Sequence, residues 1–192
     1  MPGGRKGAAL GGMLKRVIDV VFATLALVLL TPLLVGTAVL IRLLIGRPII
    51  VAERSVGLGG EVFAVYRFRT TLDDAAAASG WTEIIAQALR TSRIDKLPHL
   101  YNVVRGDMSL VGPELVGAHH ALHFGIEAPE LLLARPGVVS VRRYVPHSLR
   151  TSRGEIGPER LYILRWSMWL DLRIACGALA RIHAQDASRP AK

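Results

Sequence analysis

The sequence contains a single cysteine, Cys176, among 192 residues. One cysteine excludes an internal disulfide framework and fits a reducing compartment, and the apolar helical pattern around it favours a buried, unreactive thiol. Several motifs of nucleotide-binding and hydrolytic enzymes are also missing: a Walker loop, a G-x-G-x-x-G loop, a Cys-x-x-Cys pair and a G-x-S-x-G elbow. Any chemistry of this chain must therefore come from another kind of site.

Acidic residues are few: 15 Asp and Glu accompany 24 Lys and Arg, which gives a formal net charge of +9 and a sequence pI of about 10.6. The chain is nevertheless apolar, with 51% hydrophobic residues and a mean hydropathy of +0.37. Nucleic-acid-binding proteins are basic but usually polar, whereas a basic and apolar chain is typical of a protein at an anionic membrane surface. We therefore expect membrane lipid, and no nucleic acid, among its partners.

Charge is absent from residues 20–41, which read VVFATLALVLLTPLLVGTAVLI. A continuous helix of this length could just cross a hydrocarbon core of about 30 Å, but Thr31-Pro32 interrupts its middle, and an interior proline kinks or breaks a helix. Basic residues on both sides favour the cytoplasm for both ends. We expect a re-entrant helix that enters and leaves one leaflet; a single spanning helix and a buried helix of a soluble protein are the alternatives. The flanking basic residues are Arg5, Lys6, Lys15, Arg16, Arg42 and Arg47.

The fold class that we expect is α+β: a small, mostly helical cytoplasmic domain with a short β-hairpin, anchored by the re-entrant helix and by interfacial amphipathic helices. Asp19, at the entrance of the apolar run, lies one helical turn from Lys15 and Arg16 and is expected to pair with one of them. The chain divides into a disordered basic tail over 1–12, the re-entrant helix over 13–46, the cytoplasmic domain over 47–183 and a tail over 184–192.

Alternating and β-branched residues predict the hairpin, with strands in IIVAER and EVFAVYRFRT joined by the glycine-rich turn SVGLGG. A turn and a further strand are expected in RPGVVSVRRYVPH. Helical spacing of apolar residues predicts the remaining elements. These are an amphipathic helix ending at Arg90, a helix that begins near Pro98 and ends at Gly106-Asp107, a helix over 114–134 and a long helix over 158–183.

Arginines are abundant, and their planar guanidinium groups suit phosphate, although attraction to lipid headgroups explains such a surface as well. Arg67 and Arg69 alternate onto one side of the second strand, where two parallel guanidiniums suit an anionic group; a solvated strand face is an equally simple explanation. The candidate phosphate- or substrate-binding residues are Arg54, Arg67, Arg69, Arg90, Arg93 and Arg135.

Two further groups of residues are candidates for chemistry. His119, His123 and Glu127 recur every four residues, which would place them on one helix face; a solvated or interfacial face is preferred there to a metal site. In RIDKLPHL, Asp95 is either a catalytic carboxylate or the ion-pair partner of Arg93 and Lys96, and the residues alone leave both readings open.

The order of the motifs is more specific than any one of them. The chain contains KRVIDVVFATLALVLLTPL, GRPIIVAERSVGLGGEVFAVYRFRT, TSRIDKLPHLYNVVRGDMSLVGP, ARPGV and YILRWSMWLDLRI. In this order, across residues 13–180, it closely resembles the bacterial sugar transferases, the monotopic polyprenol-phosphate phosphoglycosyl transferases that initiate exopolysaccharide and O-glycan assembly. The resemblance implies a location at the cytoplasmic face of the bacterial inner membrane, and Thr31-Pro32 matches the Ser-Pro break of the family's re-entrant helix.

The resemblance also implies a reaction. In the family, the aspartate of an Asp-Glu pair attacks the β-phosphate of a nucleotide-diphosphate sugar, expels the nucleoside monophosphate and passes the phosphosugar to polyprenyl phosphate, with Mg²⁺ assisting. Asp95 matches the position of that nucleophile. A carboxylate can form an acyl-phosphate and so divide one difficult transfer into two steps. A second copy of the chain is left open as a further partner.

Three positions depart from the family's pattern. Lys96 occupies the place of the glutamate in the Asp-Glu pair; Glu114-Leu115 replaces Arg-Pro after Gly112-Pro113; and Ser140-Val141-Arg142 replaces Thr-Gly-Trp after Arg135-Pro136-Gly137. Lysine loses a hard oxygen ligand and repels Mg²⁺, although its ammonium also neutralises phosphate. Three hypotheses follow: an active transferase with an altered metal site, a catalytically impaired member that serves as a membrane-bound partner in polysaccharide assembly, and an unrelated basic membrane-binding module.

Overall fold

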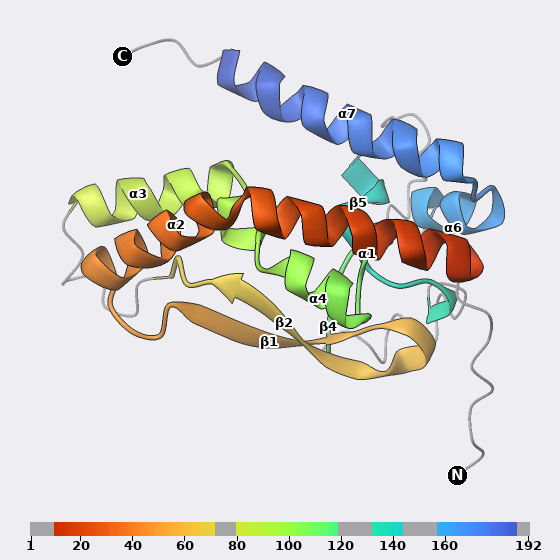
Figure 1. The fold of residues 1–192 in the computed structure, drawn as a ribbon, viewed down its shortest axis with the longest axis horizontal. Coiled ribbons are helices and arrows are strands. Elements are labelled where there is room, and N and C mark those ends of the chain that lie inside the picture. The colour runs from red at the N-terminus through yellow and green to blue at the C-terminus, as the bar shows by residue number, and fades with distance from the viewer. Residues whose placement is uncertain (1–9, 72–79, 119–131, 144–156, 188–192) are drawn as a thin grey trace.

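A computed structural model describes residues 10–71, 80–118, 132–143 and 157–187 (Figure 1). The molecule is built in layers, with α1 packed on α4 and α4 packed on the hairpin of β1 and β2. Helix and sheet are mixed and helix predominates, which confirms the expected α+β class. The helices are α1 (Gly12–Leu29), α2 (Thr31–Leu44), α3 (Gly80–Thr91), α4 (His99–Arg105), α6 (Gly157–Leu164) and α7 (Met168–Ala187).

The apolar N-terminal run forms two helices, α1 and α2, with an angle of 61° between them. The bend falls at Leu30, where Pro32 lies in the first turn of α2, a place where a missing backbone N–H costs nothing. The hydroxyl of Thr31 donates a hydrogen bond of 2.8 Å to the carbonyl oxygen of Leu27 and so satisfies a group that the break would expose. The expected break at Thr31-Pro32 is therefore confirmed. Within the described residues no single helix is long and apolar enough to cross a membrane, whereas this bent pair is by length and composition.

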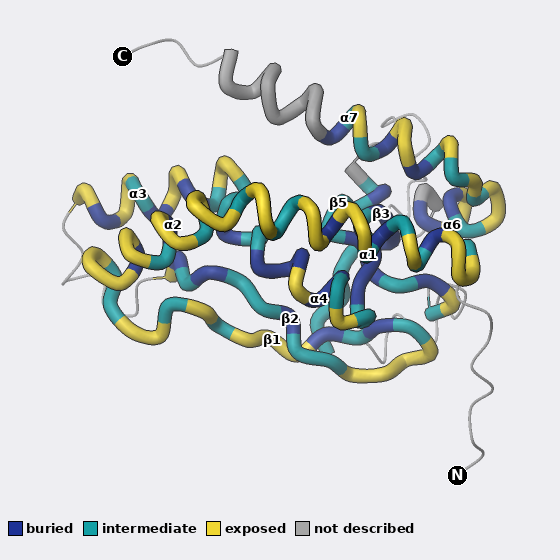
Figure 2. Tube along the Cα trace, in the orientation of Figure 1, coloured by how far each residue is buried: buried dark blue, intermediate teal, exposed yellow. Residues whose placement is uncertain are grey.

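The inner faces of α1 and α2 are buried and their outer faces are not. Ala23 and Ile41 lie on the buried side, where α1 meets α4 and α2 meets the end of the hairpin. Figure 2 shows the opposite sides of α1, α2 and the neighbouring α3 as largely exposed. The exposed side chains there are large and apolar, and include Phe22, Leu25, Leu29, Leu43, Trp81 and Ile84.

The hairpin pairs β1 (Ile50–Val56) with β2 (Val62–Phe68) in antiparallel register, Ile50 opposite Phe68. The turn contains Gly59 at a φ of 68° and Gly60 at 83°, a conformation that glycine adopts without strain. A short strand, β4 (Val116–Gly117), extends this sheet on the β1 side.

A separate parallel pair consists of β3 (Ser109–Gly112) and β5 (Gly137–Ser140). A Cβ atom on Gly112 or on Gly137 would overlap the backbone of the other strand, so this pairing requires both glycines. The strand expected after Arg135-Pro136 is thereby confirmed.

The free edge of β2 is covered by a side chain of α4. Asn102 is fully buried; its amide nitrogen donates to the carbonyl oxygen of Ala64 at 2.7 Å, and its amide oxygen accepts a hydrogen bond from the N–H of Tyr66 at 3.1 Å. A single amide thus satisfies two backbone groups that an edge strand would otherwise leave unpaired. Because α4 begins at His99, four residues after Asp95, this contact also restricts the position of Asp95 relative to β2.

We expect Asn102→Ala to lower the free energy of unfolding by about 2–4 kcal/mol, because the carbonyl of Ala64 and the N–H of Tyr66 would lose their partner in a buried place. Urea unfolding of the purified chain followed by circular dichroism measures this. Arg105→Ala, on the exposed side of the same helix, is the control and should cost less than about 1 kcal/mol. An equal loss in both variants would contradict the role assigned to Asn102.

Three sequence-based expectations were wrong. The helix expected over 158–183 is two helices, because the hydroxyl oxygen of Ser167 accepts the N–H of Leu170 at 3.1 Å and so starts α7 as a new helix. The helix expected over 114–134 is replaced at Val116–Gly117 by β4, since pairing with β1 outweighs local propensity there; residues 119–131 lie outside the described residues. Cys176 is exposed, because it falls on the outer side of α7.

Candidate active site

Asp95 lies in η2 (Ile94–Lys96), a single 3-10 turn between α3 and α4. The preceding residue, Arg93, has a φ of 63°, a left-handed conformation that residues other than glycine rarely adopt and that tertiary contacts must hold in place. The side chain of Asp95 is 5% exposed, and its Oδ1 has no hydrogen-bond partner within the described residues. A buried carboxylate oxygen without a partner is costly in a folded chain, so it marks a candidate for chemistry.

Positive charge surrounds this carboxylate. Burial raises the pKa of Asp95, and the nearby cations Lys96, Arg93 and Arg67 act in the opposite direction. Burial and the charge of Arg93 lower the pKa of Lys96. Burial, with Lys96 and Arg67, lowers the pKa of His99 to about 4, so that this imidazole is neutral at pH 7. The surroundings of Asp95 therefore favour an anionic ligand that would share the three cationic groups.

Two of the six candidate arginines lie close enough to act on Asp95, namely Arg67 and Arg93. Arg67 reaches η2 from β2, which packs against it. One terminal nitrogen of Arg67 is paired with Glu53 on β1, while its Nε is buried and has no hydrogen-bond partner in the described part of the chain. This N–H is thus a donor that a ligand could use.

The other four arginines lie elsewhere. Arg54 is exposed on β1, opposite Ala64. The remaining three donate hydrogen bonds of 2.5 to 2.9 Å to backbone carbonyl oxygens: Arg69 to Arg47, Arg90 to Thr70 and Arg135 to Gly106. None of the four is among the charges that act on the pKa of Asp95. Their assignment as phosphate ligands stays a prediction.

The loop after β3 brings one acidic residue, Glu114, towards the site, and Glu114 is bonded to a second, Glu159 of α6. Glu114, one of the departures from the family's pattern, acts on the pKa of Lys96 and pairs with Arg142 at 3.4 Å. Its backbone N–H donates to the carboxylate of Glu159 in α6 at 2.6 Å. Glu159 is only 1% exposed, and burial raises its pKa to about 7. The sequence offered no signal for it, because a glutamate in the first turn of a helix is ordinarily a solvated residue.

The raised pKa of Glu159 makes the stability of the fold depend on pH. The folded chain holds a proton that the unfolded chain releases above its ordinary pKa of 4.5, so stability falls as the pH rises from about 4.5 to above 7. We expect Glu159→Gln to keep the acceptor for Glu114 and to abolish this loss, which makes the variant more stable than the parent by about 3 kcal/mol at pH 8 and equal to it at pH 4. Chemical unfolding across this pH range measures the difference. Glu83→Gln, at an exposed carboxylate, is the control; a parallel pH profile in the parent and Glu159→Gln would contradict the prediction.

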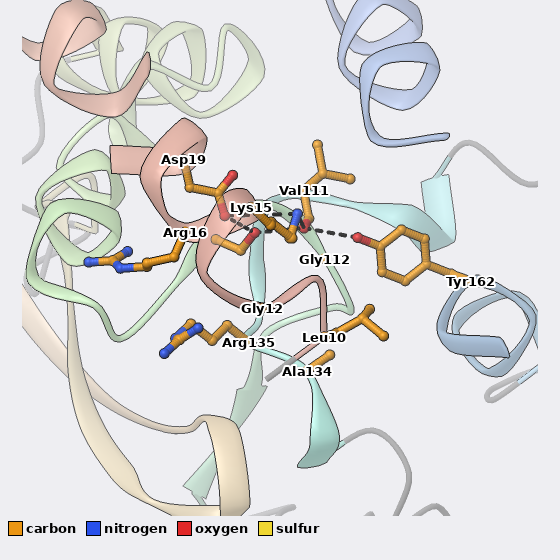
Figure 3. Close-up of a pocket in the computed structure, with 11 residues that line it drawn as sticks. Leu10, Gly12, Lys15, Arg16, Asp19, Val111, Gly112, Ala134, Arg135 and Tyr162 are labelled. Carbon is orange, nitrogen blue, oxygen red and sulfur yellow. Dashed lines mark hydrogen bonds and ion pairs between the residues drawn. The ribbon is translucent and has the colours of Figure 1, made fainter. Parts of the chain in front are cut away.

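A second polar cluster lies away from Asp95, at a shallow pocket between α1, β3 and α6 (Figure 3). Lys15 is buried there and donates to a carboxylate oxygen of Asp171 at 2.5 Å and to the carbonyl of Val111 at 3.2 Å. It also lies 3.8 Å from Asp19, which confirms the pairing expected within α1. Tyr162 donates to the other oxygen of Asp171 at 2.6 Å. Because these groups satisfy one another, the cluster connects the start of the bent helix pair to the C-terminal helices.

The donor set around Asp95 does not fit Mg²⁺. Magnesium takes hard oxygen ligands, and the residue beside Asp95 is Lys96, whose ammonium would repel it. In the part of the chain that the structure describes, no three His, Cys, Asp or Glu side chains come together in a way that could hold a metal ion. His119, His123 and Glu127 lie outside that part.

Comparison with known proteins identifies the family. Residues 10–185 match the family described as bacterial sugar transferase. A UDP-glucose:undecaprenyl-phosphate glucose-1-phosphate transferase of Caulobacter vibrioides is 35% identical over 96% of this chain and 75% of its own length. A transferase of the same name from Xanthomonas campestris is 31% identical over 89% of this chain, and the match covers 39% of the Xanthomonas protein.

A third relative differs in the sugar of its name. It is a UDP-N-acetylgalactosamine-undecaprenyl-phosphate N-acetylgalactosaminephosphotransferase of Aeromonas hydrophila, 32% identical over 84% of this chain and 41% of its own length. The chain thus spans about two fifths of the Xanthomonas and Aeromonas proteins. The resemblance drawn from the order of the motifs is confirmed, and the chain belongs to the bacterial sugar transferase family, whose named relatives are sugar-phosphate transferases.

Proposed function

We propose that this chain transfers a sugar phosphate from a UDP-sugar to polyprenyl phosphate and so initiates a glycan or exopolysaccharide. The observation that carries the proposal is the buried Asp95: its Oδ1 has no hydrogen-bond partner in the part of the chain that the structure describes, and Arg67, Arg93 and Lys96 act on its charge. A carboxylate in such surroundings attracts a diphosphate and is positioned to attack it. The named relatives support UDP-sugar and undecaprenyl phosphate as the substrate classes.

The reaction proceeds in two displacements. A carboxylate oxygen of Asp95 attacks the β-phosphorus; the bond from that phosphorus to the bridging oxygen breaks, and UMP leaves with its electron pair. The resulting aspartyl phosphosugar is then attacked at phosphorus by a phosphate oxygen of the polyprenyl phosphate, which releases the carboxylate of Asp95 and forms a polyprenyl diphosphate sugar. The cationic groups stabilise the charge on the phosphoryl oxygens in both steps.

A place at the cytoplasmic face of the bacterial inner membrane follows from the same proposal. The lipid substrate requires access to a bilayer, and the bent pair of α1 and α2 offers an exposed apolar surface for it. Basic residues at both ends of the pair suit a re-entrant path with both ends on one side. Trp81 in α3 and Trp169 in α7 are exposed aromatic side chains of the kind that lie at a membrane interface.

A second candidate is a catalytically impaired member that acts as a membrane-bound partner in polysaccharide assembly. The observation that favours it is Lys96, which stands where the family has a glutamate. On this reading the fold and the membrane surface are kept while the turnover of nucleotide sugar is lost.

The test is release of UMP by the purified chain in lipid nanodiscs that contain polyprenyl phosphate, with a panel of UDP-sugars, in the presence of Mg²⁺ and in the presence of EDTA. UMP release from at least one sugar, dependent on polyprenyl phosphate for multiple turnovers, supports the transferase. No release from any sugar under either condition rejects it in favour of the second candidate.

A further inference from the structure

The site around Asp95 has an unusual distribution of charge for a centre that handles a diphosphate. Three cationic side chains, Arg67, Arg93 and Lys96, act on one buried carboxylate. Of these, Arg67 is already paired with Glu53. The ammonium of Lys96 and the guanidinium of Arg93 make no side-chain hydrogen bond or ion pair within the described residues. Asp95 balances only one of these two remaining cations, so one positive charge is left over for a ligand.

Among the described residues, oxygen ligands for a divalent cation are few around Asp95. Asp95 contributes one carboxylate, and Glu114, which also acts on Lys96, is engaged with Arg142. His99 is buried beside the same cations, and its neutral imidazole is a poor ligand for a hard ion that prefers oxygen. A divalent ion placed at Asp95 would lie next to Lys96 and would be repelled by it.

Lys96 lies where its positive charge can neutralise the phosphoryl oxygens of a diphosphate, as a divalent ion would. It follows the buried carboxylate directly in η2 and is itself half-buried, so its charge acts in a medium where it is screened less than at the surface. An ammonium has three donors and no acceptor, and it neutralises phosphoryl oxygens as a compact point charge. Arg67 Nε is buried and has no partner among the described residues, so it is a further donor of fixed direction near the same carboxylate.

We propose that this site binds its nucleoside diphosphate as the metal-free anion, with the ammonium of Lys96 supplying the positive charge at the diphosphate. The inference rests on the proposed function for the identity of the ligand, and it concerns binding, so it can fail or hold independently of turnover. On this proposal, the lysine that replaces the family's glutamate supplies the positive charge that a bound divalent ion would otherwise supply.

The experiment is calorimetric titration of UDP into the full chain in nanodiscs, once with excess EDTA and once with Mg²⁺. For the parent protein we expect dissociation constants that agree within about twofold under the two conditions. For Lys96→Glu we expect binding to be lost in EDTA, since the site would then hold two adjacent carboxylates and too little positive charge, and to return when Mg²⁺ is added. Lys96→Gln removes the charge without adding a ligand, so it should bind about 10- to 100-fold more weakly than the parent in both conditions.

Lys96→Arg is the matched control, because it keeps the positive charge and should bind UDP without Mg²⁺. The proposal is overturned if the parent binds UDP only with Mg²⁺, or if Lys96→Gln binds as tightly as the parent. Melting temperatures of the four proteins show that each is folded under the conditions of the titration. If the parent binds UDP without metal but releases no UMP from any UDP-sugar, this inference holds and only the proposed transferase activity is rejected.

Discussion

Asp95→Asn is expected to abolish UMP release, with a loss of turnover of about 10³-fold or more. The amide has the shape of the carboxylate but cannot form the acyl-phosphate bond on which the two-step transfer depends. The assay is UMP release with whichever UDP-sugar the parent protein uses best. Incubation with a UDP-sugar labelled in the β-phosphate, followed by denaturation, should leave label on the parent chain and none on Asp95→Asn.

The variant should remain folded. Burial raises the pKa of Asp95, which means that the fold disfavours its ionised form, so a neutral isostere is expected to keep or raise the melting temperature. Asp107→Asn is the control: this carboxylate lies just after α4 and pairs with Arg105 at 3.3 Å, away from the charges around Asp95. Turnover retained in Asp95→Asn, or lost equally in Asp107→Asn, would show that Asp95 is not the nucleophile.

Asp171→Ala is expected to lower the free energy of unfolding by about 3–5 kcal/mol, the largest effect on stability that the structure predicts. The substitution leaves the buried ammonium of Lys15 without the carboxylate that lies 2.5 Å from it, and Asp19, at 3.8 Å, compensates only in part. Tyr162 and Trp166 lose the acceptor of their hydrogen bonds as well. Thermal and urea unfolding of the purified chain measure the loss.

A double variant separates lost charge pairing from lost packing. Replacing both members of a buried ion pair by apolar residues of similar size is often neutral, so Lys15→Met with Asp171→Leu should recover the part of the loss that comes from the unpaired ammonium. The recovery is incomplete, because Tyr162 and Trp166 still lack their acceptor and Asp19 loses its nearby cation. The side chains of Asp171 and Lys15 are 11% and 8% exposed, which is why the unpaired charge costs more here than at the surface. If the double variant were as unstable as Asp171→Ala, the ion pair would not be the source of the effect.

Several elements could be predicted because their cause is local. A proline in the middle of an apolar helix interrupts it whatever the surrounding fold, so Pro32 predicts the break. The hydroxyl of Thr31 satisfies the carbonyl of Leu27, four residues earlier in the chain. The glycine-rich turn at 57–60 supports positive φ angles, and β-branched residues flank it, so the hairpin follows from the sequence. The helix that begins after Pro98 ends at Gly106, whose φ of 112° is the ordinary left-handed end of a helix.

Other features depend on contacts between distant segments. The break at Ser167 was missed because the apolar pattern continues through it, and β4 was missed because a two-residue strand exists only through its pairing with β1. Buried polar residues such as Asn102, Glu159 and Asp171 resemble surface residues in the sequence, since each has a partner 38, 45 or 156 positions away. No local pattern reports a partner at that distance.

By itself, the sequence determined the class of this protein: a basic and apolar chain with a broken apolar helix, a hairpin and an ordered set of motifs that belongs to the bacterial sugar transferases. Net charge and hydropathy are sums over the residues of the chain, and the broken helix, the hairpin and the motifs depend on residues that are neighbours in the sequence. Only the tertiary structure decided which charges meet. It brings Arg67 from β2 to Asp95 and engages Arg69, Arg90 and Arg135 with backbone carbonyls. Among the described residues, it leaves Lys96 without a side-chain hydrogen bond or ion pair beside the buried carboxylate. The physical reason is that Coulomb and hydrogen-bond energies depend on distance in space and on burial, both of which the packing of α4 and η2 against β2 sets.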